Sequence, residues 1–232
     1  MSLMRKFFLI FIFFVFDMFL LVGFLVIRDA TNLNYLKKEE AILKEMNFSS
    51  DSYDLSIKSS GEFGVAEKYI KTYLNDYALQ FQDTFTFIQD EKFTGLLSYD
   101  HYIQEDFYFL DSIFYLKSVQ NRFNYNIRSL IKKSSDDSIR SYVLDSSYSS
   151  KLFYDFMSDE KMRLKFYESK NNLVYYSNQI NNLFNECYYV LSFLNTYQEQ
   201  WVLEDGEIKF ANDQLLNQYL ESIQRIKNYS YL

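Results

Sequence analysis

The chain has 232 residues, a formal net charge of −7 and 20% aromatic residues. This acidic balance disfavours a nucleic-acid partner, because binding phosphates requires clustered Lys and Arg. With one cysteine and one histidine, the chain excludes an intramolecular disulfide and any metal site built from several thiolates or imidazoles of a single chain.

The sequence begins with a short basic tail, residues 1–6, and continues with an apolar run from Phe7 to Ile27. As a helix this run would be about 31 Å long, at roughly 1.5 Å per residue, which matches the hydrocarbon core of a bilayer. Arg28 lies at the critical third position before any cut after Ala30, so signal cleavage is not expected. The sequence therefore predicts a single transmembrane helix over 7–28 that anchors the protein in the cell membrane.

The orientation of this anchor depends on its flanks. Basic residues stand on both sides of the apolar run, so the positive-inside bias is weak. A short basic tail before an anchor, with a long acidic domain after it, most often leaves the tail in the cytoplasm. We therefore predict that the domain after the anchor is extracytoplasmic.

Asp17 stands at the midpoint of the apolar run. A carboxylate at the centre of a membrane helix costs about 2.5 to 3.5 kcal/mol on insertion scales, and ionisable residues there usually face a partner or a polar cavity. One interpretation is a contact with a partner helix or with a second copy of the chain. The other is a protonated acid that the surrounding Phe, Leu and Ile residues make tolerable. The first interpretation predicts a protein partner or self-association through the transmembrane helix.

The region between the anchor and the domain shows two kinds of pattern. Residues 29–48 contain helix formers and no breaker, with leucines at three- and four-residue steps, which predicts a helical stalk. The Ser- and Asp-rich stretch 49–61 predicts a linker. Residues 29–61 are thus assigned to a stalk and linker, and residues 62–232 to a helical domain.

The domain contains no proline, which permits long uninterrupted helices. Ser59 and Glu62 have the spacing of a capping box and predict the start of the first helix. Apolar residues then recur at three- and four-residue steps in three long segments, 66–88, 110–130 and 173–194. A break with a short helix is expected at 90–102, and a loop at 132–138 followed by one or two short helices.

The last of these segments has the cleanest heptad pattern. Its apolar positions alternate steps of three and four: Leu173, Tyr176, Ile180, Leu183, Cys187, Val190 and Leu194. This pattern places Cys187 in the core, where free cysteines are commonly found.

The stretch "WVLEDGEIKFAN", residues 201–212, breaks the helical pattern. Asp205-Gly206 between two short β-prone segments predicts a hairpin with a type I′ turn, which needs positive φ at both central residues. Asn212 or Asp213 is expected to cap a last helix. The predicted fold is therefore all-α: a bundle of about four main helices with a small β-hairpin near 201–210.

A resemblance supports this organisation. The stretches "GEFGVAEKYIKTYLNDY" and "WVLEDGEIKF", together with the order of anchor, linker and helices, resemble a group of uncharacterised, membrane-attached, mostly helical proteins of Gram-positive bacteria. The resemblance covers most of residues 60–226. It implies a bacterial protein that faces the cell surface, and it supplies no catalytic residue and no assigned activity.

The best local candidate for catalysis is His101, which lies four residues before Glu105, with Asp100 and Asp106 nearby. An imidazole beside a carboxylate can act as a base or bind a metal, but such pairs are also common at solvated helix ends. The sequence has no Gly-rich phosphate loop, nucleophile elbow or HExxH motif. The acidic run 134–137 lacks the spacing of a calcium loop. We therefore expect no cofactor, no metal and no enzymatic activity.

The aromatic residues suggest a binding surface instead. The pairs Tyr175-Tyr176 and Tyr188-Tyr189 cannot both face one core, because consecutive helix residues diverge by about 100°. Some of these tyrosines must be exposed, and we interpret the four as candidate contacts for a protein partner or as part of a ligand groove. The alternative is a compositional bias that places Tyr wherever its size is tolerated.

These observations favour one functional hypothesis. The protein is a non-enzymatic, single-pass membrane protein whose acidic helical domain binds another protein at the cell surface, as a subunit of a complex. A more specific form is an immunity or inhibitor protein. The alternative is an extracytoplasmic small-ligand-binding or enzymatic domain, which needs a deep pocket with converging polar groups. His101, Asp100 and Glu105 buried at such a pocket would favour it.

Overall fold

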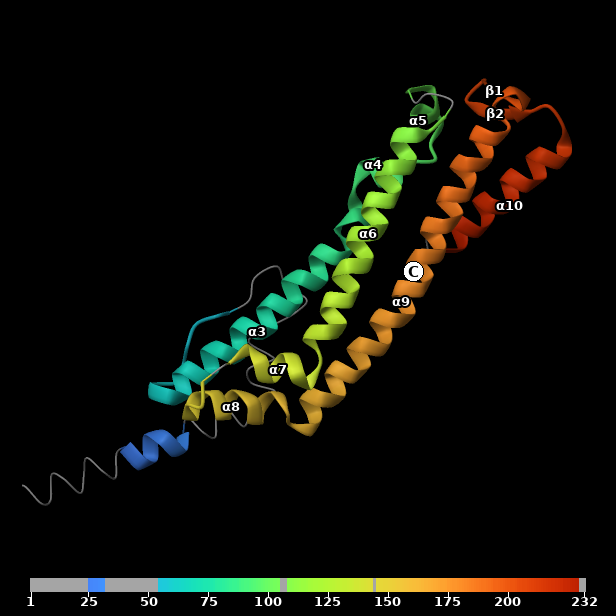
Figure 1. Ribbon diagram of the computed structural model, residues 1–232. Helices are drawn as coiled ribbons and strands as arrows, with labels where there is room; N and C mark the ends of the chain where they lie inside the picture. The colour runs from blue at the N-terminus through green and yellow to red at the C-terminus, as the bar shows by residue number, and fades with distance from the viewer. Residues whose placement is uncertain (1–24, 32–53, 105–107, 144, 230–232) are drawn as a thin grey trace, which may run out of the picture. The chain divides into compact units, whose positions relative to one another are not determined.

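The computed structural model describes residues 25–31, 54–104, 108–143 and 145–229. Within these ranges the chain is mostly helical, with one two-stranded antiparallel hairpin (Figure 1). This confirms the predicted helical class and its small β-element. No helix in the described part combines the length and the apolar character needed to cross a bilayer. Apart from 25–28, the predicted membrane helix with Asp17 lies outside the described residues.

Four long helices correspond to the four main helices expected from the sequence: α3 (Gly61–Phe85), α6 (Leu110–Lys133), α9 (Glu160–Thr196) and α10 (Asp213–Tyr229). Between them lie short elements: η1 (Thr86–Gln89), α4 (Glu91–Thr94), α5 (Tyr99–Gln104), α7 (Asp136–Tyr142), α8 (Tyr148–Met157) and η2 (Gln198–Gln200). The chain divides into two compact units, and the predicted boundary of the domain at residue 62 stays a prediction. The first contains Ile139–Arg163 and the residues up to Asp76, and the second contains Tyr77–Ser138 and Leu164–Leu232.

The first unit packs α7 and α8 against the beginning of α3. Its core is apolar and aromatic: Phe63, Ala66, Ile70, Tyr73, Leu74, Ile139, Leu152, Phe153, Phe156 and Met157. Tyr73 lies edge-on to Phe153, with 5.8 Å between ring centroids, and to Tyr142 at 4.8 Å. Edge-to-face aromatic pairs of this kind add to the stabilisation from burial. The aromatic residues of this region are thus used for packing.

The start of α3 differs from the predicted capping box of Ser59 and Glu62. A carboxylate oxygen of Glu62 accepts a hydrogen bond from the backbone N–H of Ser149, at 3.2 Å, beside the start of α8. The backbone N–H of Ser59 donates to Glu67, at 2.8 Å. Because Gly61 has φ +60°, the chain turns sharply into α3, and the two predicted capping partners bond to other groups. The predicted box is therefore wrong in its partners, although the helix begins at the predicted place.

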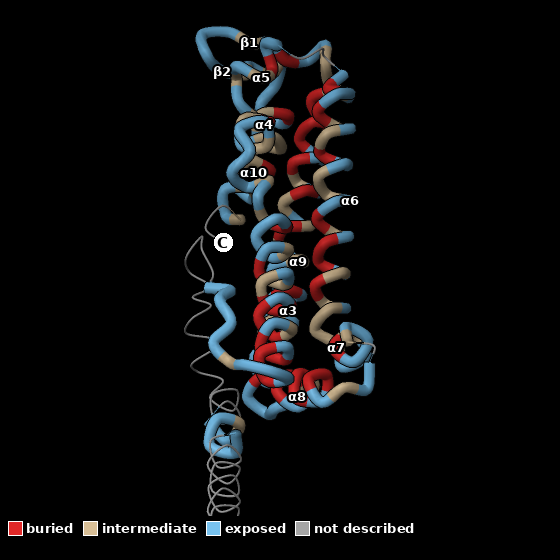
Figure 2. The backbone as a smooth tube through the Cα atoms, turned by 90° about the vertical axis from the view of Figure 1, so that its left-hand side faces the viewer, coloured by how far each residue is buried: buried red, intermediate tan, exposed pale blue. Residues whose placement is uncertain are grey.

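The second unit has its core between α6 and α9. Figure 2 shows the buried positions of α6 along the side of that helix turned toward α9. Phe123 of α6 is 1% exposed and contacts three other phenylalanines: Phe85, Phe87 and Phe184, with ring centroids 5.6 to 5.9 Å away. The apolar pattern predicted for 110–130 is thus the core-facing side of α6.

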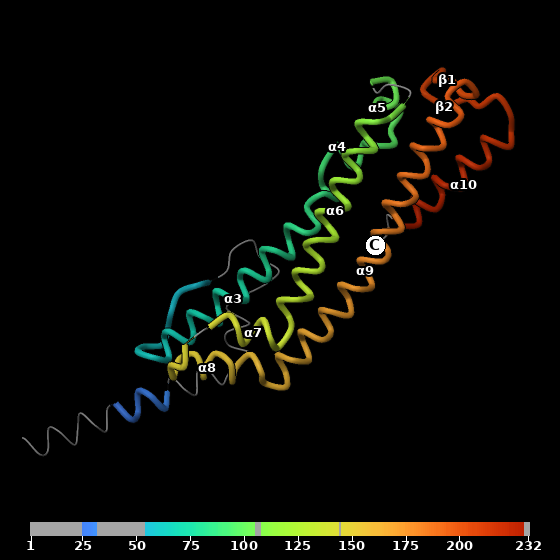
Figure 3. Tube along the Cα trace, viewed as in Figure 1, coloured from blue at the N-terminus to red at the C-terminus, as the bar shows by residue number. Residues whose placement is uncertain are grey.

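The heptad pattern of α9 is confirmed at Cys187, which is 5% exposed, and it fails at Tyr176, which is 41% exposed. Helix α10 runs back along α9 after the hairpin (Figure 3). Near the end of α10, Arg225 donates to Glu186 at 2.8 Å. Tyr176 lies ten residues, or about 15 Å, before Glu186 along α9. Tyr176 is also turned about 80° from Glu186 around α9, so it does not lie on the side of α9 where Arg225 binds.

The predicted hairpin is confirmed in detail. Strand β1 (Trp201–Glu204) pairs with β2 (Glu207–Phe210), and Trp201 lies opposite Phe210. Asp205 and Gly206 have φ of +54° and +83°, as a type I′ turn requires. Asn212 accepts a hydrogen bond from the Leu215 backbone N–H at 3.0 Å and thereby caps α10.

The hairpin is fastened to the core through Trp201. The indole N–H of Trp201 donates to the Leu194 carbonyl oxygen at 2.8 Å, and its ring stacks on Phe109 at 6.2 Å. Trp201 is 3% exposed. A buried tryptophan normally needs a partner for its N–H, and the last turns of α9 supply one.

Candidate functional site

Large apolar side chains lie exposed on the outer face of α9. Leu164, Tyr167, Val174, Tyr175 and Tyr189 have 56%, 62%, 44%, 54% and 45% of their surface exposed. At about 100° per residue, the five fall within an arc of about 100° on the helix circumference. We call these five residues the α9 stripe. The stripe lies roughly opposite the buried side of α9, which includes Leu173 and Leu191.

The four tyrosines predicted as partner contacts are all exposed, but they do not form one surface. Tyr175 and Tyr189 belong to the α9 stripe. Tyr176 is turned about 140° from Tyr189, and Tyr188 about 140° from Tyr175. The Lys117 ammonium of α6 lies 5.4 Å from the centroid of the Tyr188 ring, which places Tyr188 toward α6. Contact with a partner stays a prediction for all four.

Sequence reasoning missed three members of the stripe: Leu164, Tyr167 and Val174. They stand on the side of α9 opposite the heptad positions, at steps of three and seven residues. The signal was therefore present as a second, weaker apolar period on the same helix. It was hidden because asparagines such as Asn171 and Asn178 interrupt it.

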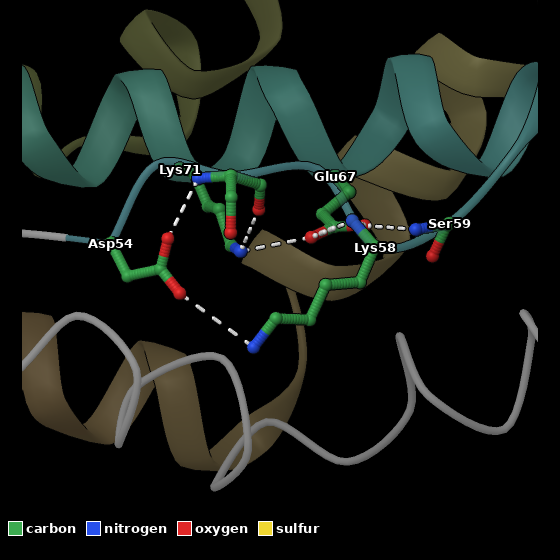
Figure 4. A network of polar contacts seen from close by, with 6 residues as sticks. Asp54, Lys58, Ser59, Glu67 and Lys71 are labelled. Carbon is green, nitrogen blue, oxygen red and sulfur yellow. Dashed lines mark hydrogen bonds and ion pairs between the residues drawn. The ribbon is translucent and has the colours of Figure 1, made fainter.

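A second candidate site lies in the first unit, where residues 54–60 run along α3 (Figure 4). We call residues 54–60 the strap. The sequence predicted a linker here, but the strap is bound: the Glu67 carboxylate accepts hydrogen bonds from the backbone N–H groups of Lys58, at 3.0 and 3.1 Å, and of Ser59, at 2.8 Å. The Lys71 ammonium donates to the Ser56 carbonyl oxygen at 2.6 Å.

The two charged residues that hold the strap are buried. Glu67 is 0% exposed and Lys71 is 1% exposed, and they form an ion pair of 2.9 Å one helical turn apart. Removing two charges from water is unfavourable unless they are paired and their remaining hydrogen-bonding capacity is used. Here the backbone of the strap supplies those additional partners. The strap and the ion pair therefore stabilise each other.

A groove of about 380 Å³ lies between η1 and α6 in the second unit. Asp83 and Arg122 form an ion pair of 2.6 Å at this groove, and the Tyr115 hydroxyl donates to Asp90 at 2.7 Å. This hydrogen bond, together with one from the Lys92 backbone N–H, lowers the pKa of Asp90. Burial and the Asp90 carboxylate raise the pKa of Tyr115. Both carboxylates of this groove thus already have partners, Asp83 the Arg122 guanidinium and Asp90 the Tyr115 hydroxyl.

A groove of about 340 Å³ in the first unit contains Asp145 and several serines. Asp145 accepts hydrogen bonds from the Ser150 hydroxyl and from Ser147, and these lower the pKa of its carboxyl group. The Ser147 hydroxyl in turn accepts from the Ser150 backbone N–H at 3.2 Å, so it caps α8. The polar groups here serve the start of a helix.

The structure describes His101 but only part of the site considered for catalysis. Its Nε2 lies 2.6 Å from the hydroxyl oxygen of Ser112, which is 1% exposed in the first turn of α6. Ser112 is therefore a buried hydrogen-bonding partner of the imidazole. Glu105 and Asp106 lie outside the described residues, and neither of the two grooves includes His101. Among the described residues, no three His, Cys, Asp or Glu side chains lie together where a metal could be held.

Cys187 is buried in α9, and burial raises the pKa of its thiol to about 12. A thiol with this pKa carries almost no thiolate near neutral pH, and thiolate is the reactive form. Cys187 is therefore a core residue, as its heptad position predicted.

Comparison of the chain with protein-family models, curated proteins and solved structures finds no match. The resemblance to membrane-attached helical proteins of Gram-positive bacteria stays a prediction.

Proposed function

We propose that this chain is a single-pass membrane protein whose helical domain binds another protein at the cell surface, as a subunit of a complex. The observation that carries the proposal is the α9 stripe. Tyr175 and Tyr189 give it two amphipathic rings, and Leu164 and Val174 add aliphatic surface. Tyrosine is enriched at protein interfaces because its ring is buried on binding while its hydroxyl finds a polar partner.

The stripe is not needed for the core of the second unit. That core is filled by other aromatic side chains, including Phe123, Phe184 and Trp201, each at most 3% exposed. On the outer face of α9, Tyr189 stacks on the buried Phe193 with 6.1 Å between ring centroids, whereas Leu164, Tyr167 and Tyr175 each keep more than half of their surface exposed. A group of apolar side chains on a solvent-exposed face usually marks an interaction site.

The alternative, a small-ligand-binding or enzymatic domain, has less support. In the groove beside η1, Asp83 is already paired with Arg122, and Asp90 with Tyr115. A binding pocket needs polar groups that converge on the ligand. The immunity or inhibitor form of the proposal predicts in addition that the protein protects its cells from one defined toxin.

A photocrosslinking experiment tests the stripe. Benzoylphenylalanine is introduced in place of Tyr167 or Tyr175 in the full-length chain, in the cells that produce it, and adducts are identified by mass spectrometry. We expect both positions to yield an adduct with the same protein. Tyr167→Ser and Tyr175→Ser should each weaken its co-purification about tenfold, because an interface tyrosine commonly contributes 1 to 2 kcal/mol or more.

Tyr125 provides the matched control for the stripe, because it is 72% exposed on α6 and lies outside the stripe. The same photoreactive residue at Tyr125 should not give this adduct, and Tyr125→Ser should leave co-purification unchanged. Equal crosslinking from Tyr125 and Tyr167 would mean that capture reflects exposure alone, and the proposed surface would be abandoned.

Asp17 is tested separately. If its carboxyl group contacts a partner helix or a second copy, Asp17→Leu should abolish the specific crosslink formed within the membrane, since the partner would lose the polar group that it contacts. Phe16→Leu, at the neighbouring position of the same apolar run, should retain the crosslink. An identical crosslinking pattern for wild type and Asp17→Leu would identify Asp17 as a protonated acid that the membrane tolerates.

A further inference from the structure

The strap is held to α3 through its backbone. Its apolar side chains, Leu55 and Ile57, are 43% and 42% exposed, so they are partly covered but are not core residues. Among its polar contacts, Glu67 accepts from two backbone N–H groups, Lys71 donates to one backbone carbonyl oxygen, and the Gly64 N–H donates to the Ser60 carbonyl oxygen at 3.3 Å. Since every residue except proline carries both groups, this mode of binding does not depend on side-chain identity.

Gly64 completes the site. A Cβ atom at this position would lie 2.7 Å from the Ser59 carbonyl oxygen, which is closer than real Cβ contacts allow. The absence of a side chain therefore lets an extended backbone approach α3. Gly64, Glu67 and Lys71 stand three and four residues apart, so the three positions share one face of the helix. On this face, Gly64 lets a peptide backbone come close, Glu67 accepts hydrogen bonds from its N–H groups, and Lys71 donates one to its carbonyl oxygen.

The strap can leave this face without disturbing the core of the first unit. None of the strap side chains belongs to that core, which includes Ile70 and Phe153. When the strap opens, water can solvate Glu67 and Lys71, so the charges are not left buried and unpaired. Segments held by few polar contacts are the ones that open locally while the rest of a protein stays folded.

We propose that the α3 face formed by Gly64, Glu67 and Lys71 is a binding site for an extended peptide backbone. The strap occupies this site in the same chain, and an extended peptide occupies it when the strap leaves. The site requires two consecutive residues that each donate a backbone N–H to Glu67. In the strap these residues are Lys58 and Ser59. This inference is independent of the proposed partner surface on α9.

The test uses the full-length chain with Ser59→Pro. This substitution removes the backbone N–H that donates a hydrogen bond to Glu67 at 2.8 Å. The probe is a fluorescein-labelled, end-blocked peptide with the sequence of residues 54–60, and binding is followed by fluorescence anisotropy. We expect this peptide to bind the Ser59→Pro chain at least tenfold more tightly than the wild type, whose site is occupied. A second peptide with proline at the positions of Lys58 and Ser59 should not bind.

Ser59→Ala is the matched control. The Ser59 hydroxyl is buried without a hydrogen-bond partner among the described residues, so the alanine variant loses no contact and keeps the backbone N–H. It should bind the peptide as weakly as the wild type does. A folded Ser59→Pro chain that fails to bind the peptide, or that binds the proline peptide equally well, overturns the proposal.

A second measurement decides the question if Ser59→Pro does not fold. Hydrogen exchange of the strap amides is recorded for the wild-type chain with and without millimolar concentrations of the unlabelled peptide. Capture of the open site should speed exchange of the Lys58 and Ser59 amides at least twofold, while the amides of α8 keep their rates. Unchanged exchange of the strap amides would contradict the proposal.

Discussion

Replacing Glu67 by alanine is expected to lower the free energy of unfolding of the first unit by about 3 kcal/mol, the low end of the range for breaking a buried ion pair. The variant removes the carboxylate that lies 2.9 Å from the Lys71 ammonium and that accepts two backbone N–H groups. The effect lies at the low end because the strap can open and let water reach Lys71. Urea unfolding of the full-length chain, followed by circular dichroism and hydrogen exchange, measures it.

Two further variants separate the effect of leaving a buried charge unpaired from the effect of losing an exposed ion pair. Lys58→Ala keeps the backbone N–H that donates to Glu67 and removes an exposed ion pair with Asp54 at 3.7 Å. Its cost should stay below about 0.5 kcal/mol, because exposed ion pairs contribute little. The double variant Glu67→Met, Lys71→Met should lose less stability than Glu67→Ala, since it leaves no buried charge. If Glu67→Ala is no worse than Lys58→Ala, the buried pair does not hold this unit together.

Phe123→Ala is expected to destabilise the second unit by about 4 kcal/mol, since removing a buried phenylalanine leaves a cavity and removes its apolar contacts. Phe123 is 1% exposed and packs against Phe85, Phe87 and Phe184. The loss should appear as earlier unfolding in urea and as faster hydrogen exchange in α6. The Glu67 variant should instead affect exchange in the first part of α3 and in α8.

The control for this substitution lies nine residues earlier on the same helix. Phe114 is 66% exposed, so Phe114→Ala should change the free energy of unfolding by no more than about 0.5 kcal/mol. A similar loss of stability for both variants would show that α6 does not turn Phe123 toward a closely packed core.

Much of the secondary structure could be predicted because its causes are local. The apolar steps along 110–130 follow the 3.6-residue period of α6, and Asp205-Gly206 supplies the positive φ that a tight hairpin needs. Cys187 could be placed in the core for the same reason. Each of these predictions depends on residues within a few turns of one another.

The site-level predictions failed where partners come from distant positions. Glu62 has the spacing of a capping residue, but its carboxylate bonds to Ser149, which lies 87 residues away. Tyr176 fits the heptad pattern of α9, but it is 41% exposed. A sequence pattern shows which side of a helix is apolar, and it does not show which of those positions a neighbouring element covers.

The sequence by itself determined the helical class, the long helices, the hairpin turn and the apolar character of residues 7–27, because hydrophobic period, turn chemistry and composition act locally. Only the tertiary structure decided that residues 54–60 are bound rather than free, and that Glu67 and Lys71 hold them. It also decided which tyrosines of α9 share a face with Leu164. These features depend on which side chains stay exposed and which polar groups find partners once the helices have packed. Packing brings together residues that are far apart in the chain, so local sequence patterns do not reveal them.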